Sequence, residues 1–339
     1  MKTKLVRLPP LPSIRDILKL YQLRALRRLS QNFLLDLRIT DKIVRAAGKI
    51  ESSHVCEIGP GPGSITRSIL NKSPAKLIVL EKDRRFLPTL EMLKDASPCD
   101  VDILIGDVLC FNMENLFPSE LIKPWADRPP KIHLIGNLPF NVATPLIIKW
   151  LSNISNRSSA WKYGRVQMTL TFQKEVAERM VAPILTKQRS RLSVMIQNWC
   201  HVDHKFNIPG RAFLPKPEVD VGVVHFVPLV NPVIDLPFSM VEKIVRCLFS
   251  HRQKYCEKSL GYLFPEKTRG DMTKKLLTMA EINPTNRALQ LTLIEIGRIC
   301  HAYNEIVTEQ PLLYKYNYRK LDSALEMEIS GDIENKVAI

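Results

Sequence analysis

Apolar runs alternate with amphipathic segments between residues 54 and 182, and this alternation constrains the fold more than any other feature. The runs are HVCEIG, KLIVLE, VDILIGD, KIHLIGNLPF and RVQMTLTF. Continuous apolar runs of this kind are typical of parallel strands that helices cover on both faces. Two later runs, HKFNIPGRAF and VGVVHFVPL, are close together in the chain, as an antiparallel pair closing the sheet would be. We therefore predict a doubly wound, mostly parallel α/β sheet of seven strands that ends near residue 230.

Beyond residue 230 the pattern becomes helical. Three prolines between residues 228 and 237 mark the change, and the helical patterns are SMVEKIVRCLFSH, DMTKKLLTMAEI and LQLTLIEIGRICHAYNEIV. A chain of 339 residues exceeds what one hydrophobic core usually holds, so a second, smaller helical domain is expected over 231–315, followed by a tail at 316–339. Residues 243–275 carry nine Lys or Arg against three acids, which fits either a polyanion-binding face or an ordinary solvated helix surface.

The charge of the whole chain also bears on the kind of partner. The formal net charge is +15, and a basic surface of this kind concentrates polyanions such as nucleic acid, although a solubilising lysine surface is an alternative. Apolar residues make up 45% of the chain, which is enough for a folded core, and no apolar run approaches the roughly 18 residues that span a bilayer. We therefore expect a nucleic-acid partner and no membrane.

The seven cysteines give no sign of a structural metal or a disulfide framework. None forms a CxxC pair or a Cys/His cluster at zinc spacing, and their number is odd. We expect a reducing compartment and no metal.

The N-terminal segment, residues 1–28, is basic. The first 35 residues hold eight Lys or Arg and one acid, Asp16, and the stretch SIRDILKLYQLRALRR has an apolar and an arginine-rich face. This composition is typical of a mitochondrial transit peptide. The same stretch also fits a structural helix, because it runs without a linker into the apolar stretch NFLLD.

The motif EIGPGPGSIT follows the first apolar run. After a buried strand, Gly59, Gly61 and Gly63 allow a tight turn that brings backbone N–H groups close to a ligand at the start of a helix. A dinucleotide fingerprint, G-x-G-x-x-G/A, would need its third glycine at Ser64, which weakens the interpretation as an NAD site.

Further polar residues stand where the next strands end. Glu81 ends the second strand, where an acid can accept hydrogen bonds from ribose hydroxyls, and Asp107 follows the third, where a carboxylate can accept from an adenine amino group. GNLPF, residues 136–140, ends the fourth strand. Its Asn137 side chain and the Leu138 carbonyl offer two acceptors beside the ring of Phe140, which suits a planar base with an amino group, whereas Asn-x-Pro alone often only ends a strand.

These motifs, with others, resemble a known family. LSQNFLLD (29–36), EIGPGPGSIT (57–66), LEKD (80–83), GDVL (106–109), GNLPFNVATPL (136–146), FQKEVAERM (172–180) and AFLPKPEVDVGVVHF (212–226) occur in the order found in ribosomal RNA adenine dimethyltransferases. The resemblance covers about residues 13–300. It implies a Rossmann-like S-adenosylmethionine-dependent methyltransferase domain at 29–230 and an RNA-binding helical domain after it.

The resemblance also implies the residues of the site. Those implied to bind S-adenosylmethionine are Gln31, Asn32, Leu34, Gly59, Gly61, Glu81, Lys82, Asp107, Val108 and Asn137. Those implied to act on the target adenine are Asn137, Leu138, Phe140 and Phe213, the two rings enclosing a flipped-out base. Many relatives carry tyrosine at the position of Phe140. Phenylalanine lacks the hydroxyl group but presents the same ring for stacking.

The activity implied is the addition of two methyl groups to each of two adjacent adenines near the 3′ end of small-subunit ribosomal RNA. The basic N-terminus fits a member of the family that is located in the mitochondrial matrix. We also expect the protein to act as a monomer. An alternative is a transcription factor that uses the same fold to bind DNA and a mitochondrial RNA polymerase. A dehydrogenase would have no use for GNLPF, and the charge of +15 argues against a small-molecule methyltransferase.

Overall fold

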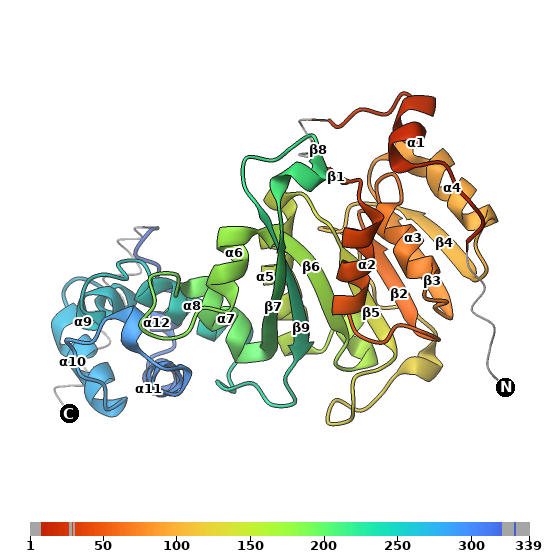
Figure 1. The fold of residues 1–339 in the computed structure, drawn as a ribbon. Helices are drawn as coiled ribbons and strands as arrows, with labels where there is room; N and C mark the ends of the chain where they lie inside the picture. Colours follow the sequence, from red (N-terminus) through yellow and green to blue (C-terminus); the bar gives the residue numbers. More distant parts are fainter. Residues whose placement is uncertain (1–7, 27–28, 30, 321–328, 330–339) are drawn as a thin grey trace. The chain divides into compact units, whose positions relative to one another are not determined.

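The structure, a computed structural model, describes residues 8–26, 29, 31–320 and 329 (Figure 1). The described residues divide into two compact units. The sheet unit comprises the described residues as far as Val181 together with Cys200–Val230, and the helical unit comprises Ala182–Trp199 and the described residues from Asn231 onward. Residues 1–7 of the expected targeting segment, and 321–328 and 330–339 of the expected tail, lie outside the described residues.

A seven-stranded sheet forms the centre of the sheet unit, which confirms the predicted fold class (Figure 1). In spatial order its strands are β4 (Asp100–Ile105), β3 (Lys76–Glu81), β2 (His54–Ile58), β5 (Ile132–Gly136), β6 (Gln167–Gln173), β9 (Val221–Pro228) and β7 (Cys200–Ile208). The first five strands are parallel, and β9 runs antiparallel to both β6 and β7. The order reverses at β2, so the carboxyl ends of β2 and β5 border the crevice where open α/β sheets bind ligands.

The helices between the strands bury the sheet. They are α2 (Leu37–Ala46), α3 (Ser64–Leu70), α4 (Leu87–Asp95), α5 (Phe140–Asn156) and α6 (Lys174–Met180). The side chain of Asp36 caps α2 by accepting a hydrogen bond from the Arg38 backbone N–H, which satisfies one of the free donors of the first turn. Every residue of α3 is buried, so this short helix depends on packing rather than on its own propensity.

The basic N-terminal segment contains a helix that belongs to the sheet unit. Helix α1 (Ile14–Leu20) begins after Ser13, and its apolar residues Ile14 and Leu18 join the same hydrophobic core as α2 and α3. A hydrogen bond of 2.7 Å from Arg67 Nη1 to the Pro12 carbonyl further holds the segment. The structural helix expected from the sequence is therefore present, and its targeting role stays a prediction.

Residues 182–199 belong to the helical unit although they precede β7, whereas the sequence placed them before the boundary expected near residue 230. Two buried polar side chains explain this placement. Arg189 donates to the Ala182 carbonyl at 3.2 Å and to the Leu291 carbonyl at 3.4 Å. Asn198, near the end of α7 (Arg191–Trp199), pairs twice with the backbone of Ile234. No local sequence pattern reveals such distant partners.

The helical unit confirms the three helical patterns of the sequence. Its later helices are α8 (Phe238–Leu248), α9 (Cys256–Leu260), α10 (Arg269–Met279), α11 (Leu293–Glu309) and α12 (Leu312–Lys315). Thr292 and Glu295 form a reciprocal capping box at the start of α11. Across both units all seven cysteines are free thiols. In the described part of the chain, no helix has the length and apolar character to cross a membrane, and no group of three acidic, His or Cys side chains is placed to hold a metal ion.

Candidate active site

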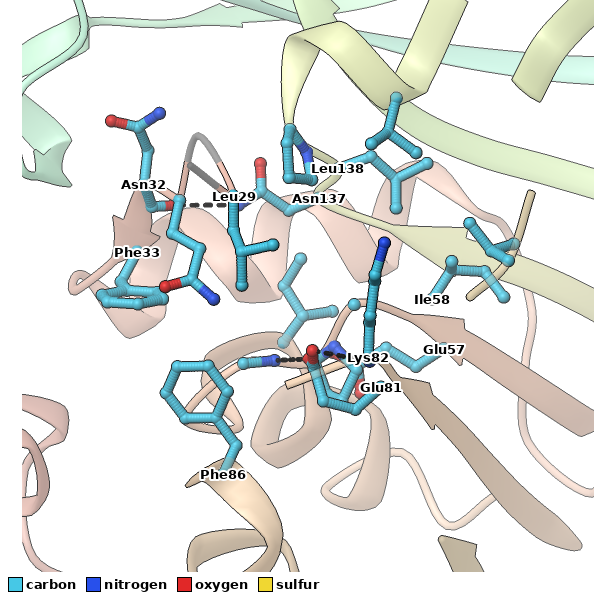
Figure 2. A pocket seen from close by; sticks show the side chains of 18 of the residues that line it. Leu29, Asn32, Phe33, Glu57, Ile58, Glu81, Lys82, Phe86, Asn137 and Leu138 are labelled. Atoms are coloured by element: carbon cyan, nitrogen blue, oxygen red, sulfur yellow. Dashed lines mark hydrogen bonds between the residues drawn. The ribbon is translucent and has the colours of Figure 1, made fainter. Parts of the chain in front are cut away.

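A cavity of about 300 Å³ lies at the carboxyl ends of β2 to β5, and Figure 2 shows part of its wall. Every residue that the sequence suggested for the site lines this cavity. They are Gln31, Asn32, Leu34, Gly59, Gly61, Glu81, Lys82, Asp107, Val108, Asn137, Leu138, Phe140 and Phe213. The structure thus brings residues from the N-terminal segment and from the last part of the sheet unit into one cavity. Their individual roles stay predictions.

The glycine motif forms the turn between β2 and α3. Gly59, Gly61 and Gly63 have φ values of +66°, +55° and +88°, which lie in the left-handed region that side chains disfavour. The Gly61 N–H donates a hydrogen bond of 2.9 Å to Glu81 Oε2. This bond fixes the turn against the end of β3, so backbone rather than side chains forms this part of the cavity wall.

Glu81 accepts three backbone hydrogen bonds. Besides Gly61, the N–H groups of Lys82 and Asp83 each donate to Oε1 at 2.8 Å. Figure 2 shows the bond from Lys82. Burial raises the pKa of Glu81, and the three N–H groups counteract part of that rise. A carboxylate has about four acceptor sites, so one site stays available to a ligand such as a ribose hydroxyl.

Lys82 and Asp107 form an ion pair on the cavity wall, with 2.8 Å between Lys82 Nζ and Asp107 Oδ2. Asp107 Oδ1 accepts from the Leu109 N–H at 3.0 Å. The hydrogen bond from Lys82 holds the pKa of Asp107 below its usual range. The acceptor expected at the adenine end is therefore ionised and held in place, with Val108 buried beside it.

A short antiparallel pair that sequence reasoning did not predict covers the cavity. Strand β1 (Phe33–Leu34) pairs with β8 (Phe213–Leu214), although the two lie 180 residues apart. The Leu34 carbonyl accepts a 2.6 Å bond from Ser64 Oγ, and Gln31 Nε2 donates to Asp83 Oδ2 at 2.9 Å. These bonds attach the N-terminal segment to the glycine turn and to β3.

Asn137 is held on both sides of its amide. Its Nδ2 donates to the Asn32 carbonyl at 3.3 Å, as Figure 2 shows, and its Oδ1 accepts from Thr171 Oγ1 at 2.8 Å. These two bonds fix the orientation of the Asn137 amide, with its NH2 group toward Asn32 and its oxygen toward Thr171. The Oδ1 atom keeps one further acceptor site. Sequence reasoning missed Thr171. The only available signal was register, since β6 pairs in parallel with β5 and brings Thr171 beside Asn137.

The two phenylalanines differ in exposure. Phe140, at the start of α5, is half-buried, whereas Phe213 is only 4% exposed and belongs to the hydrophobic core. Among the ring contacts of the described residues, none joins Phe140 to Phe213, although both line the cavity. Phe213 therefore packs in the core and also lines the cavity.

Glu57 lies at the cavity wall with its side chain almost fully buried. Burial raises its pKa to about 8, and the nearby Glu81 adds to the rise. Thr66 counteracts part of this effect, although no hydrogen bond of good geometry joins the two side chains, and Oε2 of Glu57 has no partner in the described part of the chain. Glu57 is therefore largely protonated at neutral pH.

The fold and this site define an S-adenosylmethionine-dependent methyltransferase. The glycine turn, Glu81 and the Asn-Leu-Pro-Phe motif stand at the carboxyl ends of the neighbouring strands β2, β3 and β5. The chain matches the family "Ribosomal RNA adenine dimethylase" over residues 23–298 and belongs to it. It is thus an adenine dimethyltransferase that uses S-adenosylmethionine.

Relatives from vertebrates are similar over nearly the whole chain. "Dimethyladenosine transferase 1, mitochondrial" of Homo sapiens is 57% identical, covering 94% of this chain and 92% of its own. The protein of the same name from Xenopus tropicalis is 55% identical, covering 93% and 91%. Among solved structures, a dimethyladenosine transferase from Plasmodium falciparum superposes with a TM-score of 0.63 at 24% identity, over 80% of this chain and 98% of its own, and it shows the shared fold.

Proposed function

We propose that this enzyme dimethylates two adjacent adenines near the 3′ end of the small-subunit ribosomal RNA in mitochondria, working as a monomer in the matrix. The relatives over 50% identical are named as mitochondrial dimethyladenosine transferases, and the family acts on ribosomal RNA. The observation that carries the proposal is the doubly anchored Asn137 amide beside the Leu138 carbonyl, at the mouth of a cavity that suits an adenosyl group.

The cavity fits S-adenosylmethionine. The glycine turn lines part of the cavity with backbone, and the φ values of Gly59 and Gly61, +66° and +55°, are ones that side chains disfavour. Glu81 keeps one acceptor site for the ribose, and the Asp107 carboxylate stands at the expected adenine end. We assign the remaining contacts to Gln31, Asn32, Leu34, Gly59, Lys82 and Val108. When bound, the cofactor supplies a methyl group on a positively charged sulfur.

Asn137 and Leu138 prepare the target amino group. The lone pair of an adenine amino nitrogen is delocalised into the ring, so the nitrogen is a poor nucleophile. Two acceptors, Asn137 Oδ1 and the Leu138 carbonyl, bind its two hydrogens and favour a tetrahedral nitrogen whose lone pair is free. Positioning of this kind can be worth about 7–11 kcal/mol, and the pairing of Thr171 with Asn137 holds the acceptor in place. Phe140 and Phe213 stack on the base, each contact adding about 1–3 kcal/mol.

The experiment uses the purified chain, S-adenosylmethionine and a hairpin that copies the 3′ end of mitochondrial small-subunit ribosomal RNA, with mono- and dimethyladenosine read by mass spectrometry. Asn137→Ala should abolish product, whereas cofactor binding, weakened by the loss of one of its contacts, should stay measurable. Thr171→Val removes one hydrogen bond at constant shape and should lower kcat about fivefold. Thr169→Val is the matched control, because Thr169 lies on the same strand but bonds to His225 instead.

The outcomes separate the alternatives. Dimethyladenosine made by the unmodified enzyme and lost in Asn137→Ala supports the proposal. The RNA affinity should also fall with salt, with a log–log slope of about −0.7 per phosphate contacted on single strands. No product on the hairpin or on immature small subunits, despite cofactor and RNA binding, contradicts the proposal. That result would favour the role in transcription, with DNA and a mitochondrial RNA polymerase as partners.

A further inference from the structure

Three aromatic rings from separate segments of the helical unit form a parallel stack, which we call the ring ladder. Its members are His251, after α8, Tyr262, after α9, and Tyr318, after α12. The His251 and Tyr262 ring centroids are 5.4 Å apart with an angle of 28° between the planes, and Tyr262 and Tyr318 are 4.8 Å apart at 29°. Both pairs are therefore stacked rather than edge-on.

The ring ladder lies at the surface of the helical unit. His251 is exposed, and Tyr262 and Tyr318 are half-buried. The core of the same unit packs its rings differently, since the buried pair Phe264 and Tyr303 is tilted by 59°. The ring ladder is therefore a feature of the surface of the helical unit and not part of its core.

Cations surround the ring ladder. Arg269 lies over the Tyr262 ring at 5.3 Å, and Arg319 lies over the Tyr318 ring at 5.4 Å while its Nε donates to the Tyr318 hydroxyl. Arg252 and Lys254 are exposed in the loop that carries His251. Within the described ranges, none of these four cations pairs with a carboxylate, whereas Lys275 and Arg298 of the same unit each do.

The two ends of the ring ladder differ. Arg319 covers Tyr318 at one end, whereas the exposed His251 ring stands at the other, in the loop that carries Arg252 and Lys254. Arg252 Nη1 donates to the Lys187 carbonyl at 3.0 Å, and in the described part of the chain neither cation pairs with a carboxylate. Aromatic faces next to free cations suit single-stranded nucleic acid, because a base stacks on the ring while its phosphates meet the charges. A protein partner would need acids as well as aromatic residues, and a base-paired stem offers no free base face.

We propose that the ring ladder is a stacking platform for an unpaired base of the RNA substrate, with His251 as the ring that receives the base and Arg252 and Lys254 at its phosphates. This inference rests on the proposed function, since it supposes an RNA substrate. It adds a contact on the helical unit for nucleotides that flank the methylated hairpin. It also gives the basic segment 243–275 a specific role.

Three probes test the platform by fluorescence anisotropy: the hairpin alone, the hairpin with eight unpaired nucleotides on its 3′ side, and the same tail with abasic sites. The abasic tail keeps the phosphates and removes the bases. The unmodified enzyme should bind the natural tail about tenfold more tightly than the abasic one. His251→Ala should remove that difference and leave the affinity for the other two probes unchanged.

His301→Ala is the matched control, because His301 is also exposed in the helical unit but belongs to no ring stack. His301→Ala should leave all three affinities unaltered. Tyr262→Leu, which keeps apolar volume under His251, should weaken binding of the natural tail in the same direction. Equal affinities of the unmodified enzyme and His251→Ala for the natural tail would overturn the platform, as would an equal loss on all three probes.

Methylation of the bare hairpin, measured in parallel, separates this inference from the function on which it rests. Methylation with no tail effect means that the function stands and the platform fails. Absence of methylation by the unmodified enzyme, both on the hairpin and on immature small subunits, means that the function itself fails.

Discussion

Gly136 and Gly106 offer a matched test of how closely the strands approach beside the site. Each is the last residue of a Leu-Ile-Gly tripeptide at the end of a parallel strand, and each precedes a polar site residue, Asn137 or Asp107. A Cβ on Gly136 would lie 2.8 Å from the Ile58 carbonyl oxygen of the neighbouring strand, whereas a Cβ on Gly106 would meet only side chains, at 3.4 Å. Gly136→Ala should therefore be harmful and Gly106→Ala tolerated.

The size of the effect follows from the overlap. Ordinary contact begins at 3.4 Å, so β2 and β5 would have to separate by about 0.6 Å at the pair Ile58 and Gly136. Backbone cannot yield as a side-chain rotamer does, and overpacking of this kind costs about 1–3 kcal/mol of unfolding free energy. A misplacement of 1 Å can cost about 10²-fold in rate, so the displaced Asn137 should lower kcat about tenfold.

Urea denaturation gives the stability of both variants, and single-turnover methylation at saturating cofactor gives the rate. Gly136→Ala should lose both stability and rate, and Gly106→Ala should stay within about 0.5 kcal/mol of the unmodified enzyme. If the two variants behaved alike in both assays, the close approach of β2 and β5 would not be what positions Asn137. A loss of stability without a loss of rate would refute only the inference that the overlap displaces Asn137.

Three further predictions concern buried charge and helix ends. The folded-state pKa of Glu57, about 8, lies above its ordinary 4.5. The contribution of Glu57 to stability is therefore full below pH 4.5 and is lost as pH rises through 8, by at most about 1.4 kcal/mol per pH unit. Glu57→Gln should reduce the difference between the unfolding free energies measured by urea denaturation at pH 5.5 and pH 8. Burial lowers the pKa of His225 to about 4 from 6.5, so the contribution of His225 to stability is full above pH 6.5 and is lost as pH drops toward 4. His225→Gln should reduce the difference between pH 7 and pH 5 in thermal unfolding. Thr292→Ala should cost about 1 kcal/mol in urea denaturation through loss of the α11 cap, and Thr292→Ser should cost little.

Sequence patterns predicted the sheet because each buried strand is a local apolar run between helices. The five parallel strands and the closing antiparallel pair appear where the runs lie, although β7 begins at Cys200, earlier than the run HKFNIPGRAF suggested. Residues 200–203, CHVD, alternate in polarity, which is the pattern of a strand with one face exposed. The start of β7 was missed because α7 ends at Trp199, directly before it, and no turn residue separates the two elements in the sequence.

The site was predictable where its residues follow strands in the sequence, as Glu81 and Asn137 do. What could not be predicted depends on partners far along the chain. Thr171 acts through the register of β6 beside β5, and the pairing of β1 with β8 joins two-residue strands too short to leave a pattern. Arg189 likewise gives no sign in the sequence that its partners belong to the helical unit.

The pairing of Phe33 with Leu214 affects the order in which the protein matures during synthesis. Strands β2 to β6 are all made before residue 174, so a nascent chain of that length already contains the glycine turn, Glu81 and Asn137. It lacks β8, and therefore the partner of β1 that covers the cavity. Contacts so distant in sequence form slowly, because the long loop between them must close first. Cofactor affinity in ribosome-bound chains of increasing length should accordingly rise late, once residue 214 has left the ribosomal tunnel, and not when the glycine turn emerges.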